Sequence, residues 1–132
     1  MSKTPWIIAG TAAIVLAAVL FSVRPAAGGI HPDPRPGITA ERVLTDAAVP
    51  NTPGAAQAYA AARATASTLD GLYCHCDCSK HAGHRSLLTC FETNHGAYCD
   101  ICMGEAMLAT QLASQGTSLE QIRAAIDAQF GS

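Results

Sequence analysis

The sequence has little charge and no excess of positive charge. Only 14% of the 132 residues are Asp, Glu, Lys or Arg, and the formal net charge is −2. Of the eight Lys and Arg residues, Lys3 and Arg24 lie near the N-terminus, so residues 25–132 hold six basic and ten acidic residues, a net charge of −4. Nucleic-acid-binding proteins need a basic surface that neutralises phosphates. The charge balance therefore predicts a protein that binds no nucleic acid.

Several common catalytic and structural patterns are also missing. The chain has no glycine-rich phosphate loop, no Ser/His/Asp series and no pair of carboxylates in a catalytic context. No stretch alternates apolar and polar residues with period two, which is the pattern of a half-buried strand. We therefore expect a helical protein without a sheet, and no enzyme class follows from these motifs.

Cysteine is absent from residues 1–73 and from residues 103–132, whereas the 29 residues from 74 to 102 contain all six cysteines and four of the five histidines. Thiolates and neutral imidazoles are ligands for soft and borderline metal ions, and thiols also exchange with disulfides. Ten such donors in so short a stretch indicate a chemical site. The sequence leaves metal binding and thiol–disulfide chemistry both open.

An uncharged apolar segment covers residues 6–23, between Lys3 and Arg24. As a helix its 18 residues would span roughly 27 Å, enough to cross a hydrocarbon core. We expect either a retained N-terminal membrane anchor or a cleaved secretory signal. The segment has no cysteine, so no lipobox-type lipid anchor is expected. Both alternatives place the cysteines on the extracytoplasmic or periplasmic side of the cytoplasmic membrane, or in a secreted protein if cleavage occurs.

Six of the seven prolines lie in residues 25–53. Proline fixes φ and removes a hydrogen-bond donor, so this stretch should be extended and semi-rigid. We predict three parts: a membrane anchor or signal segment in residues 1–24, a proline-rich linker in residues 25–53 that holds the domain off the membrane, and a Cys/His-rich helical domain in residues 54–132. One or two helical turns, capped by Thr39, are expected within residues 38–49.

Apolar residues recur at helical spacing in the last part of the chain. We predict a helix over residues 54–70 that ends at a left-handed Gly71, a short helix over 85–92, and a helix over 98–116 that stops at Gly116. A last helix over 117–130 should begin with a capping box between Thr117 and Glu120. The predicted fold is mainly α, a small helical bundle with a Cys/His-rich loop, preceded by an N-terminal transmembrane or signal helix and the proline-rich tether. Its alanine-rich core should bury little area, so metal or disulfides are expected to stabilise it.

The first hypothesis is a site for a soft transition metal, Cu(I) or Zn(II). Cys74, Cys76 and Cys78 alternate along the chain, and a disulfide within such a C-x-C loop is strained. Thiolate and imidazole together suit both ions. More donors are present than one tetrahedral zinc needs, which leaves open several metals, a cuprous cluster with bridging thiolates, or extra thiols with a redox role. The candidate ligands are Cys74, Cys76, Cys78, His81, His84, Cys90, His95, Cys99 and Cys102.

Two other hypotheses stand beside metal binding. Cys99 and Cys102 form a C-x-x-C motif at the expected start of a helix, where the dipole and free amides activate a thiol, so a thiol–disulfide oxidoreductase would use Cys99, Cys102 or Cys74. The strand and βαβ context of thioredoxins is missing. The third hypothesis is a disulfide-stapled structural or interaction module, in which His81, His84 and His95 would have no role.

The stretches LDGLYCHCDC, HAGHRSLLTCF and CDIC resemble the exported bacterial PCYCGC-motif proteins, also described as a CYCXC family with selenocysteine in some members. The resemblance covers roughly residues 59–112. Tyr73, His75 and Asp77 replace the family's proline, tyrosine and glycine, which adds His75 as a possible ligand. The resemblance implies an extracytoplasmic Cys/His-rich domain of no established activity, and selenocysteine in relatives favours redox chemistry. The matching positions are Cys74, Cys76, Cys78, Gly83, His84, Ser86, Leu87, Cys90, Phe91, Cys99 and Cys102.

Overall fold

Helices make up the regular structure of residues 29–131, the part of the chain that the computed structural model describes. No strand occurs among these residues, as the sequence predicts. The predicted membrane or signal helix in residues 1–24 lies outside them. Within residues 29–131 no helix has both the length and the apolar character needed to span a bilayer.

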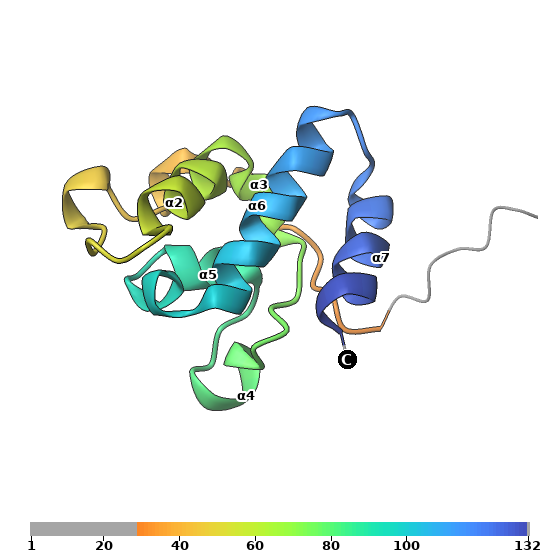
Figure 1. The fold of residues 1–132 in the computed structure, drawn as a ribbon. Helices are drawn as coiled ribbons and strands as arrows, with labels where there is room; N and C mark the ends of the chain where they lie inside the picture. The colour runs from red at the N-terminus through yellow and green to blue at the C-terminus, as the bar shows by residue number, and fades with distance from the viewer. Residues whose placement is uncertain (1–28, 132) are drawn as a thin grey trace, which may run out of the picture.

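The longest helix, α6 (Asp100–Ser114), crosses the middle of the molecule, with α2 (Ala55–Ala64) and α7 (Leu119–Phe130) packed on opposite sides of it (Figure 1). Two short helices, α3 (Ala66–Asp70) and α5 (Leu87–Phe91), also contact α6. The chain between α3 and α5 contains the single-turn helix α4 (Cys78–His81) and projects from one end of the bundle (Figure 1). This projecting loop carries the cysteine triplet.

The predicted helix over residues 54–70 is divided into α2 and α3 at Thr65, where φ is −134° and ψ is 35°. The Thr65 hydroxyl donates to the carbonyl of Ala61 at 3.0 Å, and Thr110 on α6 donates to the same carbonyl at 3.1 Å. Hydroxyl groups bound to the carbonyl four residues earlier bend helices. The division therefore lies where a local hydroxyl bond and a contact with α6 meet.

Gly71 follows α3, but the predicted left-handed cap is wrong, because its φ is −92°. A Cβ atom at this position would lie 2.8 Å from Pro34 Cγ and 2.9 Å from Leu119 Cδ2. Glycine is needed here for close packing. Gly116, in contrast, has a φ of +78° and ends α6 as predicted.

The last helix begins one residue later than expected. Ser118, and not Thr117, is the N-cap of α7: its hydroxyl accepts from Gln121 N at 3.3 Å, and its own N–H donates to Gln121 Oε1 at 3.2 Å. Residues 117–120 and 118–121 both fit the capping-box pattern, so the pattern alone does not choose between them. The short helix predicted over 85–92 is α5, and the helix predicted from residue 98 begins at Asp100, after the 3₁₀ turn η3 (His95–Tyr98).

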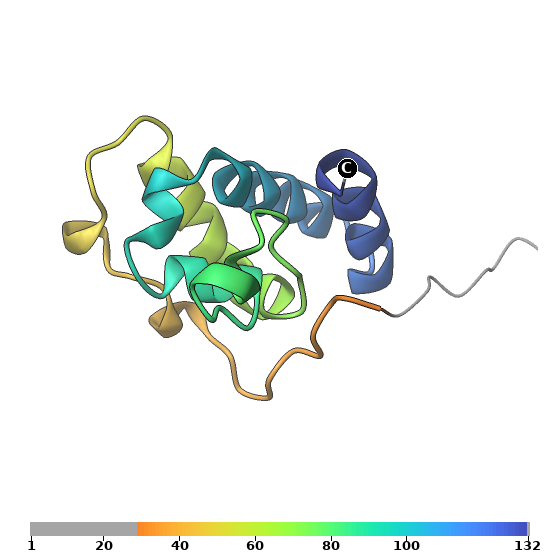
Figure 2. The same cartoon turned by 90° about the horizontal axis from the view of Figure 1, so that it is seen from below.

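The proline-rich segment lies along the outside of the bundle from residue 31 to residue 44 (Figure 2). It contains the 3₁₀ turn η1 (Ala40–Arg42), which Thr39 precedes without a side-chain cap hydrogen bond, and is followed by η2 (Asp46–Ala48). Leu44 N donates to the carbonyl of Phe91 at 2.8 Å, and Val43 is buried. This part of the predicted tether is therefore in contact with the helices.

Asp70 at the end of α3 anchors the proline-rich segment. Its fully buried carboxylate accepts from Arg35 Nη2 at 2.7 Å and from the Ser86 hydroxyl at 3.0 Å, and it pairs with Arg85 at 3.2 Å. Burial alone would raise the pKa of Asp70, but the hydrogen bonds from Arg35 hold it below its usual value. A buried carboxylate is stable only with such partners. Arg35 therefore helps to stabilise the fold.

The core combines a few large side chains with alanines and thiols. Tyr59 and Phe91 pack edge to face with ring centroids 4.9 Å apart, and Ile122 and Ile126 cover the other side of α6. Alanine removes little apolar area from water, and buried cysteines fill a further part of the interior. Among the fully buried side chains are Cys78, Cys90 and Cys102.

Candidate metal centre

Three separate parts of the fold bring the cysteines together, and a fourth adds a histidine. The triplet lies between α3 and the first residue of α4, Cys90 lies in α5, and Cys99 and Cys102 lie at the start of α6. His95 comes from η3. All six cysteines are free thiols. A centre built from elements so far apart in sequence depends on the whole fold.

Four buried sulfur atoms form what we call the inner tetrad, made of Cys74, Cys78, Cys90 and Cys102. All four Sγ atoms lie within 4.8 Å of one another. The separations are 3.2 Å for Cys74–Cys102, 3.5 Å for Cys78–Cys90 and 3.8 Å for Cys74–Cys78. Zinc bound to four thiolates at about 2.3 Å separates them by about 3.8 Å. The inner tetrad therefore fits one tetrahedral ion of this size.

Two histidines extend the centre. Cys78, His84, Cys90 and His95 form a second group, the histidine set, whose donor atoms also lie within 4.8 Å of one another. Burial, followed by the neighbouring His95, lowers the pKa of His84, so its imidazole is neutral and available as a ligand near neutral pH. The histidine set shares Cys78 and Cys90 with the inner tetrad.

Two more groups lie toward the surface. One consists of Cys76, Cys99 and Cys102, and the other of Cys76, Cys78, His81 and His95. Cys99 is the N-cap of α6, as its Sγ accepts from Cys102 N at 3.3 Å. His81 is exposed. Each of the nine ligands predicted from the sequence thus lies in at least one group, and their binding of an ion stays a prediction.

His75 lies in none of these groups, although its place within the cysteine triplet made it a possible ligand. Its Nδ1 lies 2.6 Å from Glu105 Oε1, and its backbone N–H donates to the same oxygen at 2.9 Å. Its Nε2 is 3.1 Å from Asp127 Oδ1 without hydrogen-bond geometry. Neighbouring residues of an extended segment point to opposite sides. Cys74 and Cys76 therefore face the sulfur cluster, while His75 faces α6 and α7.

Glu105 is a buried acid that the sequence did not single out. It is 0% exposed, and its Oε2 has no hydrogen-bond partner among residues 29–131. Burial, with the negative charge of Cys74, raises its pKa to about 9. Glu105 is therefore protonated at neutral pH. In the sequence, its burial is indicated only by its position as a single carboxylate within the apolar face of a predicted helix.

Hydrogen bonds within the inner tetrad lower the pKa of one thiol, while burial and the same contacts raise the pKa values of the others. Hydrogen bonds from the thiols of Cys102 and Cys90 hold the pKa of Cys74 far below its ordinary value. The same contacts, Cys74 first, raise the pKa of Cys102 well above that of a free thiol. Burial raises the pKa of Cys78. Cys74 is thus the thiolate of the group, whereas the redox hypothesis drew attention to Cys99 first.

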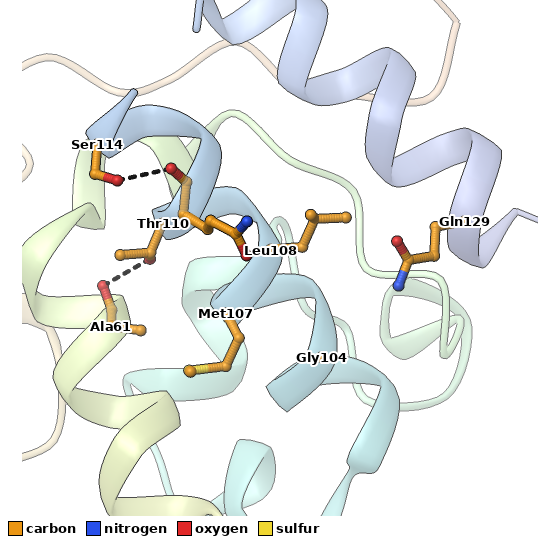
Figure 3. A pocket seen from close by; sticks show the side chains of 8 residues that line it. Ala61, Gly104, Met107, Leu108, Thr110, Ser114 and Gln129 are labelled. Carbon is orange, nitrogen blue, oxygen red and sulfur yellow. Dashed lines mark hydrogen bonds between the residues drawn. The ribbon is translucent and has the colours of Figure 1, made fainter. Parts of the chain in front are cut away.

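A shallow depression between α2, α6 and α7 is separate from this centre (Figure 3). Thr110 and Met107 line it on α6, Ala61 on α2 and Gln129 on α7. Its lining residues include no cysteine, histidine or acid, so it lacks the donors that build the metal centre. The chemistry of the described residues is concentrated at the cysteines.

Fold and site together define a small helical protein with a buried cluster of thiols flanked by histidines. Residues 43–132 match the family described as proteins of unknown function with a PCYCGC motif, and the chain belongs to that family. Membership confirms the resemblance seen in the sequence. No curated protein and no solved structure matches the chain.

Proposed function

We propose that this protein binds a soft transition metal ion, Cu(I) first and Zn(II) second, and stores, senses or delivers it outside the cytoplasm. The observation that carries the proposal is the inner tetrad: four buried thiols from three parts of the fold, with all sulfur atoms within 4.8 Å of one another. Soft thiolates select Cu(I) and Zn(II) over hard cations such as Mg²⁺ and Ca²⁺.

Electrostatics supports a bound cation. A buried thiolate without a counter-charge is unfavourable by several kcal/mol, of the order found for other buried ions. Cys74 is such a thiolate and is only 4% exposed. A metal ion at the centre of the tetrad would supply the positive charge and, as it binds, displace the protons of the other three thiols.

The choice between the two ions rests on ligand number. Four thiolates around one position satisfy tetrahedral Zn(II), but the neighbouring groups reuse Cys78, Cys90 and Cys102. Thiolates shared between ions are typical of Cu(I) clusters, in which each ion has few sulfur ligands. The overlap of groups therefore supports Cu(I) as the first candidate.

A thiol–disulfide oxidoreductase is the second candidate. The contact of 3.2 Å between the Cys74 thiolate and Cys102 favours it, because these sulfurs are close enough to form a disulfide after a small movement. Exchange with an external disulfide needs an accessible sulfur, however. Cys74 and Cys102 are both buried, so the metal proposal fits the burial better.

The proposed location rests on the sequence. The uncharged segment of residues 6–23 and the proline-rich stretch after it support export, with the membrane as a partner if the segment is retained. No physiological protein partner follows from the residues described.

The test is metal binding by the full chain, purified reduced and without oxygen in detergent micelles. We expect at least one Cu(I) or Zn(II) per chain, held against a competing chelator. The double variant Cys78→Ser, Cys90→Ser should lose affinity by more than the roughly 10- to 100-fold that follows loss of an outer-shell partner. Met107→Leu, an exposed change outside every group, is the control. Protein that retains neither ion would overturn the proposal in favour of the oxidoreductase.

A further inference from the structure

We propose that the centre is dinuclear: a second ion lies between Cys78, His84, Cys90 and His95, and the sulfurs of Cys78 and Cys90 bridge it to the ion of the inner tetrad. This inference rests on the proposed function and specifies how many ions the centre holds. It assigns His84 and His95 to the second ion alone.

The histidine set has the geometry of a complete site. His95 Nε2 lies 3.2 Å from Cys78 Sγ, and His84 Nδ1 lies 3.2 Å from Cys90 Sγ. The two sulfurs are 3.5 Å apart, and the two imidazole rings meet edge to face with centroids 4.6 Å apart. Two thiolates and two imidazoles are a common tetrahedral ligand combination.

The ring nitrogens of both histidines face the shared sulfurs. Among residues 29–131, the hydrogen bonds of His84 Nδ1 and His95 Nε2 go to Cys90 and Cys78. In each contact a proton lies between nitrogen and sulfur, and a metal ion can take its place. A metal ion at this position would bind both nitrogens and both sulfurs at once.

Charge balance also favours two ions. The four thiolates of the inner tetrad carry four negative charges, and one divalent ion leaves two of them uncompensated in a buried site. The second ion adds two positive charges while its other ligands, the imidazoles, are neutral. With two divalent ions the dinuclear centre is therefore neutral as a whole, which removes the penalty of a buried net charge, whereas two Cu(I) ions would leave two negative charges.

The test uses Co(II), a spectroscopic probe for a Zn(II) site, added stepwise to the reduced full chain. We expect two ions per chain. The first should show the strong sulfur-to-metal absorption of a thiolate site and a high-spin EPR signal. The second should weaken that EPR signal, because bridging sulfurs couple the two spins. It should also release fewer protons than the first, since the shared thiols have already ionised.

Two single substitutions separate this site from its neighbour. His84→Ala removes a ligand of the histidine set alone and should reduce the stoichiometry from two ions to one, with the thiolate absorption of the first ion retained. His81→Ala, the matched control, touches only the outer group with Cys76 and should leave both ions bound. Circular dichroism of each variant checks that the helices persist.

The alternatives give different results. A stoichiometry of one in the unaltered protein, or an EPR signal that doubles with the second ion, would overturn the shared-sulfur centre while leaving the proposed function intact. Loss of the second ion in His81→Ala but not in His84→Ala would move that ion to the outer group. No binding of Co(II), Zn(II) or Cu(I) at all would overturn the proposed function itself.

Discussion

Cys74 Sγ lies 3.2 Å from Cys102 Sγ, although the two residues are 28 positions apart. Cys74 follows α3 and Cys102 lies in the first turn of α6, so their contact joins the loop to the central helix. The hydrogen bond between them lowers the pKa of Cys74 and raises that of Cys102. A metal ion would replace this shared proton, and an oxidant would link the same two sulfurs.

Metal removal should destabilise the fold. A ligand that binds only the native state at about 100 times its Kd adds about 2.7 kcal/mol to the free energy of unfolding, which corresponds to about 10 °C or more in Tm. We expect that loss when a strong chelator is added to reduced protein, measured by thermal unfolding followed by circular dichroism. The double variant Cys78→Ser, Cys90→Ser should show no response to the chelator. An unchanged Tm in the parent protein would mean that the helices are stable by themselves.

Glu105→Gln should stabilise the metal-free protein at neutral and higher pH. The pKa of Glu105 is raised to about 9 in the fold from 4.5, so its contribution to stability is complete below pH 4.5 and is lost as the pH rises toward 9. Glutamine stays neutral and still offers an oxygen to His75. We expect a gain of about 3 kcal/mol at pH 7 in denaturant unfolding. The gain should vanish near pH 4, and Glu41→Gln on the exposed surface should change little; a pH-independent effect would contradict the assignment.

Arg35→Ala should weaken the attachment of the proline-rich segment. The variant leaves the buried Asp70 carboxylate with Arg85, Ser86 and the backbone N–H of residue 35, and we expect a loss of about 1–3 kcal/mol in the free energy of unfolding at pH 7. Because the pKa of Asp70 is lowered in the fold, its stabilising effect is present above the unfolded value and is lost as the pH falls through the folded value. The difference between variant and parent should therefore shrink in acid. Arg42→Ala, which removes an exposed pair with Glu92, is the control.

A thiol reagent should distinguish the outer sulfurs from the inner tetrad. Cys76 and Cys99 are partly exposed, whereas all four tetrad sulfurs are buried. In metal-free protein we expect two cysteines to react quickly and four slowly, with the sites identified by mass spectrometry of the labelled peptides. Bound metal should slow the tetrad further. Rapid labelling of Cys74 would instead support the oxidoreductase.

Export is tested with a reporter joined behind Ser132. A reporter that is active only outside the cytoplasm should work in this fusion, because the apolar segment of residues 6–23 precedes the whole domain. Deleting residues 6–23 from the fusion should abolish the activity. A reporter active only in the cytoplasm would end the proposed location and the disulfide hypothesis with it.

The sequence alone determined the helical class, because helical periodicity and the stop at Gly116 depend on residues within a turn or two of one another. It also placed all six cysteines and four of the five histidines in residues 74–102. Residue identity and spacing were enough to predict the family, which the match over residues 43–132 confirms.

Tertiary contacts decided the rest. The predicted helix is divided at Thr65, where Thr110 of α6 contacts it, and Pro34 and Leu119 approach Gly71 closely. The packing of α3, α5 and α6 against one another determines which cysteine sulfurs lie close together. The turning of His75 away from the cluster and the burial of Glu105 depend on the same packing. Local patterns carry no information on distances between segments, so only the folded chain separates an inner tetrad from the sulfurs around it.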